Sequence, residues 1–463
     1  MEHNRDYIKN IIRKNAIVVV VLLIFLALGE VYVFQSARNV VFMDFWRNIN
    51  TLITPTMTGK LKWNDLWGAY IGQRNPLQLS VLAFNIKYME LNCIWEVYAG
   101  MVVIALTGMV LYGEWRRSTT DSDDSSKSVV IRQIMFFPLI LALFSLNQWE
   151  ILSLQFSFAF MLRILGYVSG FVLLNNALQK NTTSFWCFLG IGTYIGVLID
   201  LLSQLYWAAL VITLFITWIV HLVRTDIKNN LGKMMAFWIP VVFSIGIYLK
   251  GLKMVGTGTG LDTFWQLLKS GDFFKAITYM LVGSLFPQSK IMEMKSSVII
   301  IVGVILVGGI ILAITLYFYN GLANKTYVPM MLCAYGLLSI PIITYGRAGA
   351  FDLMYLTSSR YTVETNLIWV GCLFVFANVI CCKRTQLCWM PIIMLTMVIT
   401  YSDVIEFRLA PYRGYYKEQL VKIEENISEY EDDKLSAFQA GSPELVRQGV
   451  ALMEKYSLNV FAN

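Results

Sequence analysis

The chain has 463 residues, of which 57% are hydrophobic and only 14% are charged. Its mean hydropathy of +0.59 exceeds what the core of a soluble protein of this length needs, which excludes an ordinary soluble domain. The formal net charge of +7 is typical of membrane-protein loops that face anionic lipid, so the composition argues against a nucleic-acid partner.

A basic segment followed by a long apolar run opens the chain. Four lysines and arginines between Met1 and Asn15 precede the run 16–34. The run is longer than the core of a typical signal peptide and contains Glu30. We therefore interpret it as an uncleaved signal anchor whose N-terminus lies in the cytoplasm.

Ten further apolar runs follow, each close to the length that a helix needs to cross roughly 30 Å of hydrocarbon. Backbone groups in lipid must be paired within their own segment, so these runs must be helical. The runs lie at 94–113, 133–150, 155–176, 185–203, 205–223, 234–252, 297–318, 327–346, 364–382 and 389–404. The sequence thus predicts an all-α polytopic bundle of about eleven transmembrane helices. The apolar piece 276–286 is too short to span, and we expect an interfacial or re-entrant helix there.

With eleven spans, several short basic connections fall on the cytoplasmic side, including those with Arg116, Arg132 and Arg224. Four segments then lie outside: 37–93, 251–296, 346–365 and 405–463. We divide the chain into a membrane module, 1–404, that includes the first outer loop, and a small extracytoplasmic segment, 405–463. Recurring apolar residues predict short helices in this segment.

Asp44 lies near the start of the first outer loop among large apolar and aromatic side chains, in the stretch Val40-Val41-Phe42-Met43-Asp44-Phe45-Trp46. Partial desolvation there raises the proton affinity of a carboxylate, which suits it to act as a base or to hold an acceptor hydroxyl. The alternative is that Asp44 only caps the helix predicted to follow it.

The same loop contains Trp63 and Trp67, four residues apart, followed by Arg74. Two rings at this spacing share one helix face. They can form part of an interfacial aromatic belt or a platform for sugar rings, and these interpretations are compatible.

The third span ends in Asn147-Gln148-Trp149-Glu150, which places polar groups at the outer interface. A carboxylate at that depth is costly unless it has a partner. Arg163 in the next span is an ion-pair partner, a phosphate ligand or an arginine that snorkels toward water. Asp200 and Gln204 lie on the same side and can contribute to the same cavity.

Two arginines belong to the short outer connection late in the chain. Arg347 follows Gly346, and Arg360 stands in Ser358-Ser359-Arg360-Tyr361-Thr362. Forked guanidinium donors beside hydroxyl groups can hold a phosphate. The alternative is a simple interfacial anchor.

In this order, the features resemble the bacterial polytopic glycosyltransferases of the GT-C superfamily, in a poorly described branch. The resemblance rests on the Asp-bearing first loop, the basic motif at Gln73-Arg74, the Gln-Trp-Glu close of the third span, and Ser-Arg-Tyr after a Gly-Arg element. It extends from Asp44 to the closing Leu458-Asn459-Val460-Phe461.

The resemblance implies transfer of a sugar, with inversion, from a polyprenyl phosphate donor to a cell-envelope glycan on the outer face of the bacterial plasma membrane. Asp44 and Glu150 are the implied catalytic carboxylates. The implied substrate and phosphate ligands are Arg74, Gln148, Trp149, Arg347, Arg360 and Tyr361. Because Gln73-Arg74-Asn75 stands where related chains often have an acidic-His-Arg element, we assign no metal and no other cofactor.

Two other functions stay open, and a purely structural scaffold is the last alternative. A lipid-linked glycan polymerase would use a similar site on longer substrates. A transporter or flippase of lipid-linked saccharides needs polar residues across the whole bilayer, and the intramembrane charges Glu30 and Arg163 are too few to suggest such a path. Besides membrane lipid, the expected partners are the donor, the acceptor glycan, and a flippase or donor synthase.

Overall fold

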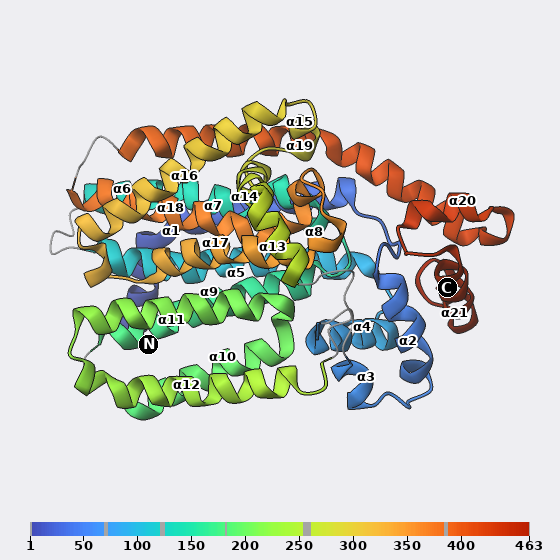
Figure 1. Cartoon of the computed structure of the whole chain (residues 1–463), viewed down its shortest axis with the longest axis horizontal. Helices are drawn as coiled ribbons and strands as arrows, with labels where there is room; N and C mark the ends of the chain where they lie inside the picture. The colour runs from blue at the N-terminus through green and yellow to red at the C-terminus, as the bar shows by residue number, and fades with distance from the viewer. Residues whose placement is uncertain are drawn as a thin grey trace.

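The structure is a computed structural model that describes residues 2–68, 73–120, 126–180, 183–252, 261–383 and 388–462. The long helices lie side by side in one bundle, and small helices gather at one end of it (Figure 1). Within the described residues, 11 helical segments are long and apolar enough to cross a membrane. The all-α, multi-pass class predicted from the sequence is therefore confirmed.

The predicted spans correspond to helices of the structure, and the largest difference is the last span, which continues well beyond residue 404. Pro138 stands near the start of α7, where its missing N–H separates α7 from α6. The spanning helices are α1 (Glu2–Ser36), α5 (Cys93–Thr119), α6 (Ser126–Met135) with α7 (Phe137–Leu143) and α8 (Trp149–Leu152), α9 (Ser157–Gln179), α10 (Phe185–Leu202), α11 (Trp207–Arg224), α12 (Ile227–Leu249), α16 (Ser296–Tyr319), α17 (Val328–Gly346), α18 (Thr362–Lys383) and α19 (Trp389–Glu425).

Helix α18 forms the centre of the bundle. In its most apolar stretch 89% of the residues are buried, against 22% in α16. Both helices are apolar enough to span, and α16, the less buried of the two, has the higher mean hydropathy. The difference is one of position: α16 presents most of its side chains outward, where lipid would cover them, whereas α18 packs against α17, α16, α7 and α19.

The loop before α5 and the C-terminal segment fold together into one unit at the end of the bundle, which we call the subdomain (described residues 37–68, 73–92 and 426–462). It contains α2 (Phe45–Met57), α3 (Trp63–Trp67), α4 (Pro76–Tyr88), α20 (Asp432–Leu435) and α21 (Pro443–Tyr456). Trp46 of α2 packs edge-on against Phe438, with ring centroids 5.4 Å apart. The boundary that we placed after residue 404 falls inside the continuous helix α19.

The closing motif joins the two parts of the subdomain. Asn459 has a φ of 57°, a left-handed conformation that asparagine tolerates better than most residues. Its backbone N–H donates to the carbonyl of Glu90 at 2.7 Å, and its side-chain amide donates to the carbonyl of Leu91 at 2.7 Å. These bonds attach the end of the chain to the turn that precedes α5.

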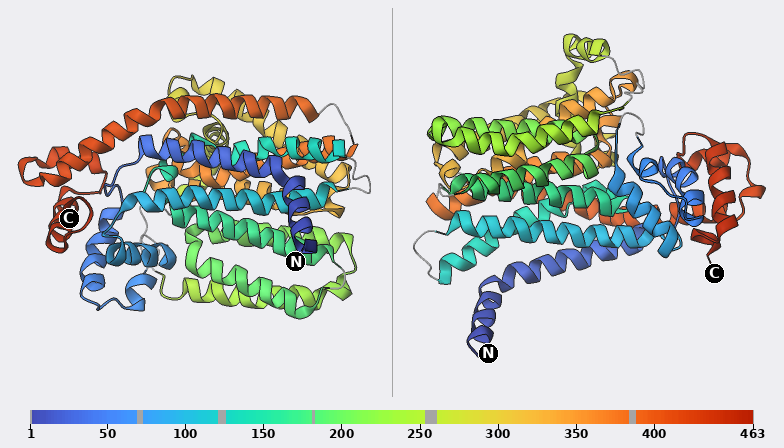
Figure 2. Two further views of the ribbon diagram at one scale, coloured as in Figure 1. Left: turned by 180° about the vertical axis from the view of Figure 1, so that it is seen from behind. Right: turned by 90° about the horizontal axis from the view of Figure 1, so that it is seen from below.

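The chain begins at one end of the bundle and the subdomain lies at the other (Figures 1 and 2). We call these the N-terminal end and the subdomain end. Because the spans alternate in direction, the connections after α8, α10, α12 and α17 are at the subdomain end, and those after α5, α9, α11, α16 and α18 are at the N-terminal end.

Helix α14 (Asp272–Gly283) covers most of the short apolar piece 276–286. Twelve residues of helix extend only about 18 Å, too little to cross the hydrocarbon. The helix is nevertheless buried over its second half, and Trp369 of α18 donates its indole N–H to Ser284 at 2.6 Å. It therefore enters between the spanning helices from the subdomain end, as expected for a re-entrant element.

Candidate functional site

Glu150 and Arg360, which are 210 residues apart in sequence, meet at the subdomain end. Nη2 of Arg360 donates to Oε1 of Glu150 at 2.7 Å. Oε2 of the same carboxylate accepts from the hydroxyls of Ser358 and Ser359 at 2.8 and 2.9 Å, and from the backbone N–H of Arg360 at 3.2 Å. The short 3₁₀ turn Ser359–Tyr361 thus surrounds the carboxylate, and Glu150 has the partner that its depth requires.

A second arginine lies beside this pair. Nε of Arg347 donates to the hydroxyl of Tyr361 at 2.6 Å, and its guanidinium carbon lies 5.1 Å from the ring centre of Tyr355. The guanidinium of Arg360 lies 5.6 Å from the same ring. The shared tyrosine brings both cations to one place. We call this group of contacting residues the arginine cluster: Glu150, Arg347, Tyr355, Ser358, Ser359, Arg360 and Tyr361.

The cluster carries one carboxylate for two guanidinium groups, so its direct contacts leave one positive charge without a counter-charge. The side chain of Glu150 is 7% exposed and that of Arg360 is 26% exposed. The cationic edge therefore faces outward while the carboxylate is buried. Apart from the bond to Tyr361, the described residues offer the guanidinium of Arg347 no acceptor. This arrangement can receive an anion with several oxygen acceptors.

Helix α14 supports the residues on both sides of the arginine cluster. Asn147 donates its side-chain amide to the carbonyl of Gly283 at 2.5 Å, and its own carbonyl accepts from Thr362 at 3.3 Å. A Cβ added to Gly283 would meet the backbone of Thr357 at 3.0 Å. The close approach at this glycine allows the connection before α18 to rest directly on the re-entrant helix.

Gln148 and Trp149, which we predicted as substrate ligands, make internal contacts instead. Gln148 is buried and donates its amide to the carbonyl of Leu143 at 3.0 Å. The ring of Trp149 lies 3.8 Å from the guanidinium carbon of Arg413 on α19. Arg413 in turn pairs with Glu406. These contacts hold α8 in position, and a direct role in substrate binding stays a prediction.

Arg163 pairs with Glu364 rather than with Glu150. Its side chain is 1% exposed, so it does not snorkel to water. Nη1 also donates to Gln204 at 3.1 Å, and the guanidinium is flanked by the rings of Phe160 and Tyr206, each 4.6 Å away. This pair joins α9 to α18 one turn below Arg360.

The side chain of Arg74 is directed toward backbone carbonyl groups at the subdomain end of the bundle. Its guanidinium donates to the carbonyls of Trp67 at 2.5 Å, Tyr248 at 2.9 Å and Lys250 at 2.6 Å. Two of these carbonyls are at the C-terminal end of α12, where helices leave carbonyl groups unpaired. Arg74 therefore attaches the loop before α5 to α12, a geometry that does not favour its predicted role as a phosphate ligand.

Asp44 lies at the N-cap position of α2 at the subdomain end, with its side chain exposed. Its carboxylate does not cap the helix, and the described residues give it no hydrogen-bond partner. A bond from Gln155 to the carbonyl of Phe42, 3.1 Å long, joins the segment before Asp44 to the turn that follows α8. Asp44 makes no direct contact with the cluster, so a shared pocket stays a prediction.

The tryptophan pair stacks as its spacing predicts, with ring centroids 5.8 Å apart and planes 25° apart. The guanidinium of Arg74 lies 5.2 Å from the Trp67 ring, and Trp63 is 56% exposed. The pair therefore offers one open aromatic face on the subdomain, which is compatible with both interpretations of the sequence.

Sequence reasoning missed Tyr355, Glu364 and Arg413. Glu364 had a signal, because it is the first residue of the predicted span 364–382, where a carboxylate requires a partner. Tyr355 had none, because it stands in an irregular connection where no helical spacing relates it to Arg347 and Arg360. Arg413 had none either, because it contacts Trp149 from a distant part of the chain. No group of three or more histidine, cysteine or acidic side chains is placed to hold a metal within the described ranges. Comparison with protein families, curated proteins and solved structures finds no match to this chain.

Proposed function

We propose that this protein is a membrane glycosyltransferase that transfers a sugar from a polyprenyl phosphate donor to a cell-envelope glycan. The observation that supports the proposal most directly is the arginine cluster, where two guanidinium groups and one buried carboxylate meet at an end of the bundle. A donor with a lipid tail can reach such a position from the bilayer, with its phosphate at the level of the arginines.

The charge of the cluster suits the bond that breaks. The acceptor oxygen attacks the anomeric carbon, the bond from that carbon to the phosphate oxygen breaks, and the electron pair leaves with the phosphate. The donor phosphodiester carries one negative charge, and the departing phosphate monoester carries a second. Cationic donors therefore bind the leaving group more strongly than the intact donor, which is the condition for catalysis rather than for binding alone.

The two predicted carboxylates differ in what they can do. Glu150 accepts four hydrogen bonds and holds Arg360 in place, which makes it a positioning residue. Asp44 is exposed and its carboxylate is uncommitted, so it can accept the proton that the acceptor hydroxyl loses. We therefore propose Asp44 as the base and Arg347 and Arg360 as the phosphate ligands.

The proposal is tested with the full-length protein in lipid vesicles, a panel of polyprenyl phosphate monosaccharides and a crude envelope glycan as acceptor. Release of free polyprenyl phosphate is measured, because this product is common to every sugar. We expect release from at least one donor, and a loss of at least about 100-fold in Arg360→Ala, since removal of one preorganised donor typically has that effect.

The matched control is Arg447→Gln. Arg447 pairs with the exposed Asp432 on the subdomain, away from the cluster, so this variant should keep full release. The proposal fails if no donor in the panel is cleaved, or if Arg360→Ala and Asp44→Asn retain the wild-type rate at equal membrane abundance. Analysis of product length separates single-sugar transfer from polymerisation.

A further inference from the structure

The stacked tryptophans of α3 take no part in the proposed transfer reaction. The rings of Trp63 and Trp67 lie 5.8 Å apart with planes 25° apart. Trp67 is partly buried, whereas Trp63 is 56% exposed. Because Trp67 covers one face of the Trp63 ring, the opposite face is the open one. We call this pair the tryptophan platform.

Arg74 holds the platform in a fixed position. Its guanidinium lies 5.2 Å from the ring centre of Trp67 and donates to the carbonyl of the same residue at 2.5 Å. Its bonds to the carbonyls of Tyr248 and Lys250 attach it to the end of α12. An aromatic face that is already ordered loses little conformational entropy when a ligand stacks on it.

Buried hydrogen bonds connect the end of α12 to the helix that follows the arginine cluster. Tyr248 donates its hydroxyl to the carbonyl of Gln204 at 2.7 Å, and the side chain of Gln204 accepts from Arg163 at 3.1 Å. Arg163 pairs with Glu364 in the first turn of α18. Helix α3 lies beside α4 at the subdomain end (Figure 1). The platform and the cluster are thus fixed to one frame at the same end of the bundle.

The surface around Trp63 is polar. All residues of the run 57–65 except Leu61 are exposed, and the large apolar ones among them are Met57 and Trp63. A helix that lies in a bilayer surface needs a wider apolar face than this. One flat ring among polar side chains instead suits a sugar, which has apolar C–H groups on a ring face and hydroxyl groups around its edge.

The charges near the ring favour an acidic ligand. Lys60 and Lys62 are exposed, and no ion pair within the described residues engages either ammonium group. One oxygen of Asp65 accepts from the backbone N–H of Lys62 at 2.8 Å. The stretch 57–72 contains these two lysines and this one acid, a formal net charge of +1. An anionic group on a bound sugar therefore meets the lysines beside Trp63.

We propose that the tryptophan platform binds an acidic glycan, with a sugar ring on the open face of Trp63 and a carboxylate or phosphate of the glycan at Lys60 and Lys62. That this glycan is the acceptor rests on the proposed function. The binding itself requires no donor, so it is measured separately.

The test measures binding of oligogalacturonate, a chain of uronic acids, to the purified full-length protein in lipid nanodiscs. Maltohexaose supplies sugar rings without charge, and polyglutamate supplies carboxylates without sugar rings. We expect oligogalacturonate to bind most tightly. Trp63→Ala should weaken its binding about ten-fold because a stacking contact is lost, and Trp63→Phe should recover part of it. Lys60→Gln/Lys62→Gln should weaken binding about five-fold at low salt, and this difference should vanish in about 1 M salt.

Trp265→Ala is the matched control, because Trp265 on α13 (Leu261–Ser270) follows α12 at the same end and is 55% exposed. It should bind oligogalacturonate as the wild type does. Equal binding by the wild type and Trp63→Ala, or equal affinity for polyglutamate, would overturn the site. A charged maleimide should label Trp63→Cys in nanodiscs above the wild-type background. Failure to label it would place the ring in the bilayer and would also overturn the site.

The transfer assay separates this site from the proposed function. Trp63→Ala should raise the KM for an acidic acceptor about ten-fold and leave kcat unchanged. If no donor is cleaved but Trp63→Ala still loses oligogalacturonate, the site stands and the proposed transfer fails. If transfer proceeds with an unchanged KM, the proposed transfer stands and the platform is not the acceptor site.

Discussion

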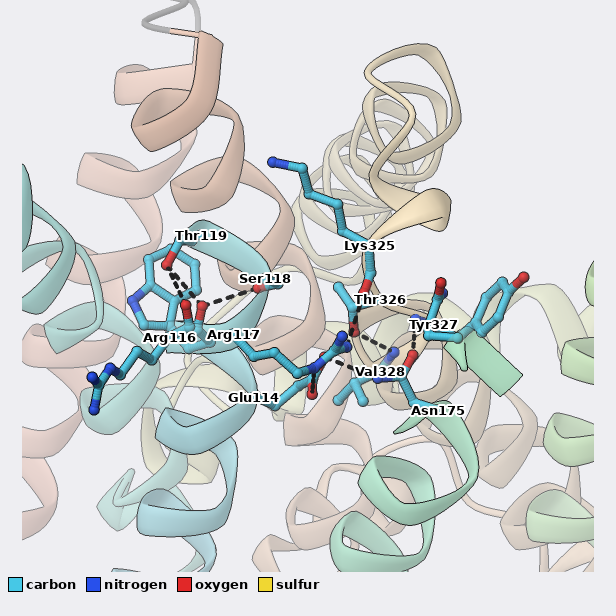
Figure 3. A network of polar contacts seen from close by, with 12 residues as sticks. Glu114, Arg116, Arg117, Ser118, Thr119, Asn175, Lys325, Thr326, Tyr327 and Val328 are labelled. Atoms are coloured by element: carbon cyan, nitrogen blue, oxygen red, sulfur yellow. Dashed lines mark hydrogen bonds and ion pairs between the residues drawn. The ribbon is translucent and has the colours of Figure 1, made fainter. Parts of the chain in front are cut away.

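The arginine cluster and the network around Glu114 occupy opposite ends of the bundle and look alike at first sight. In each, an arginine forms an ion pair with a carboxylate that is almost fully buried. Around Glu114, however, every strong contact is internal: Asn175 donates to Glu114 at 3.0 Å and accepts from the backbone of Tyr327 at 2.8 Å, and Arg117 also donates to the carbonyl of Lys325 at 2.8 Å (Figure 3).

The difference lies in charge balance and in the origin of the partners. Glu114 and Arg117 are one turn apart on α5 and neutralise each other while they join α5 to α9 and to the turn before α17. The arginine cluster draws its members from α8 and from the connection before α18, and it has a second cation with unused donors. A buried ion pair with balanced charge thus indicates a structural contact that joins helices, which we call a brace. A surplus cation with free donors indicates a binding site.

The largest effect is expected where an arginine–carboxylate pair is wholly enclosed. Arg163→Met leaves Glu364 buried without its cation, so the free energy of unfolding should fall by about 3–5 kcal/mol. Thermal unfolding in detergent measures this. The double variant Arg163→Met/Glu364→Gln should recover most of the loss. An unchanged unfolding temperature in the single variant would contradict the assignment of this pair as a brace.

Arg347→Ala should show the opposite behaviour. We expect transfer to fall about 100- to 1,000-fold because a donor to the departing phosphate is lost. The free energy of unfolding should change by about 1 kcal/mol at most, since only one hydrogen bond to protein is removed. Arg347→Lys should restore part of the rate, because it keeps the positive charge but not the paired N–H donors of the guanidinium. Equal losses of rate and stability would place Arg347 among the braces.

Arg74→Ala distinguishes the two roles considered for this residue. As an attachment between the loop before α5 and α12, Arg74 should contribute about 2 kcal/mol to stability through its charged hydrogen bonds. The KM for the donor should stay near the wild-type value in protein that remains folded. A raised KM at unchanged stability would instead support the phosphate-binding role predicted from the sequence.

The smallest effect is expected at the N-terminal end. Glu114 is buried but keeps its hydrogen bond from Asn175, and Arg117 is 39% exposed, so water can replace the guanidinium. Arg117→Ala should therefore lower the free energy of unfolding by about 1–2 kcal/mol, less than Arg163→Met. The rate of transfer per folded molecule should not change. A tenfold loss of transfer would show that the two ends are coupled, and the comparison between a brace and a site would no longer hold.

The sequence determined the class of this protein and most of its spans, because an apolar run of sufficient length has one stable form in lipid. It also singled out Glu150, Arg347, Arg360 and Tyr361 as chemically unusual residues near the ends of spans, and these four meet. Arg74 shows the limit of the same reasoning, because a motif states which donors are present but not which carbonyls they reach.

Only the tertiary structure decided the partners. Glu150 and Arg360 are 210 residues apart, and nothing local distinguishes their pairing from one between Glu150 and Arg163. The pairing of Glu150 with Arg360 is selected because α8 packs against the connection before α18, and α14 supports that connection. The joining of residues 37–92 with the C-terminal helices has the same origin: each part has an apolar face that it cannot bury alone, and the fold brings those faces together.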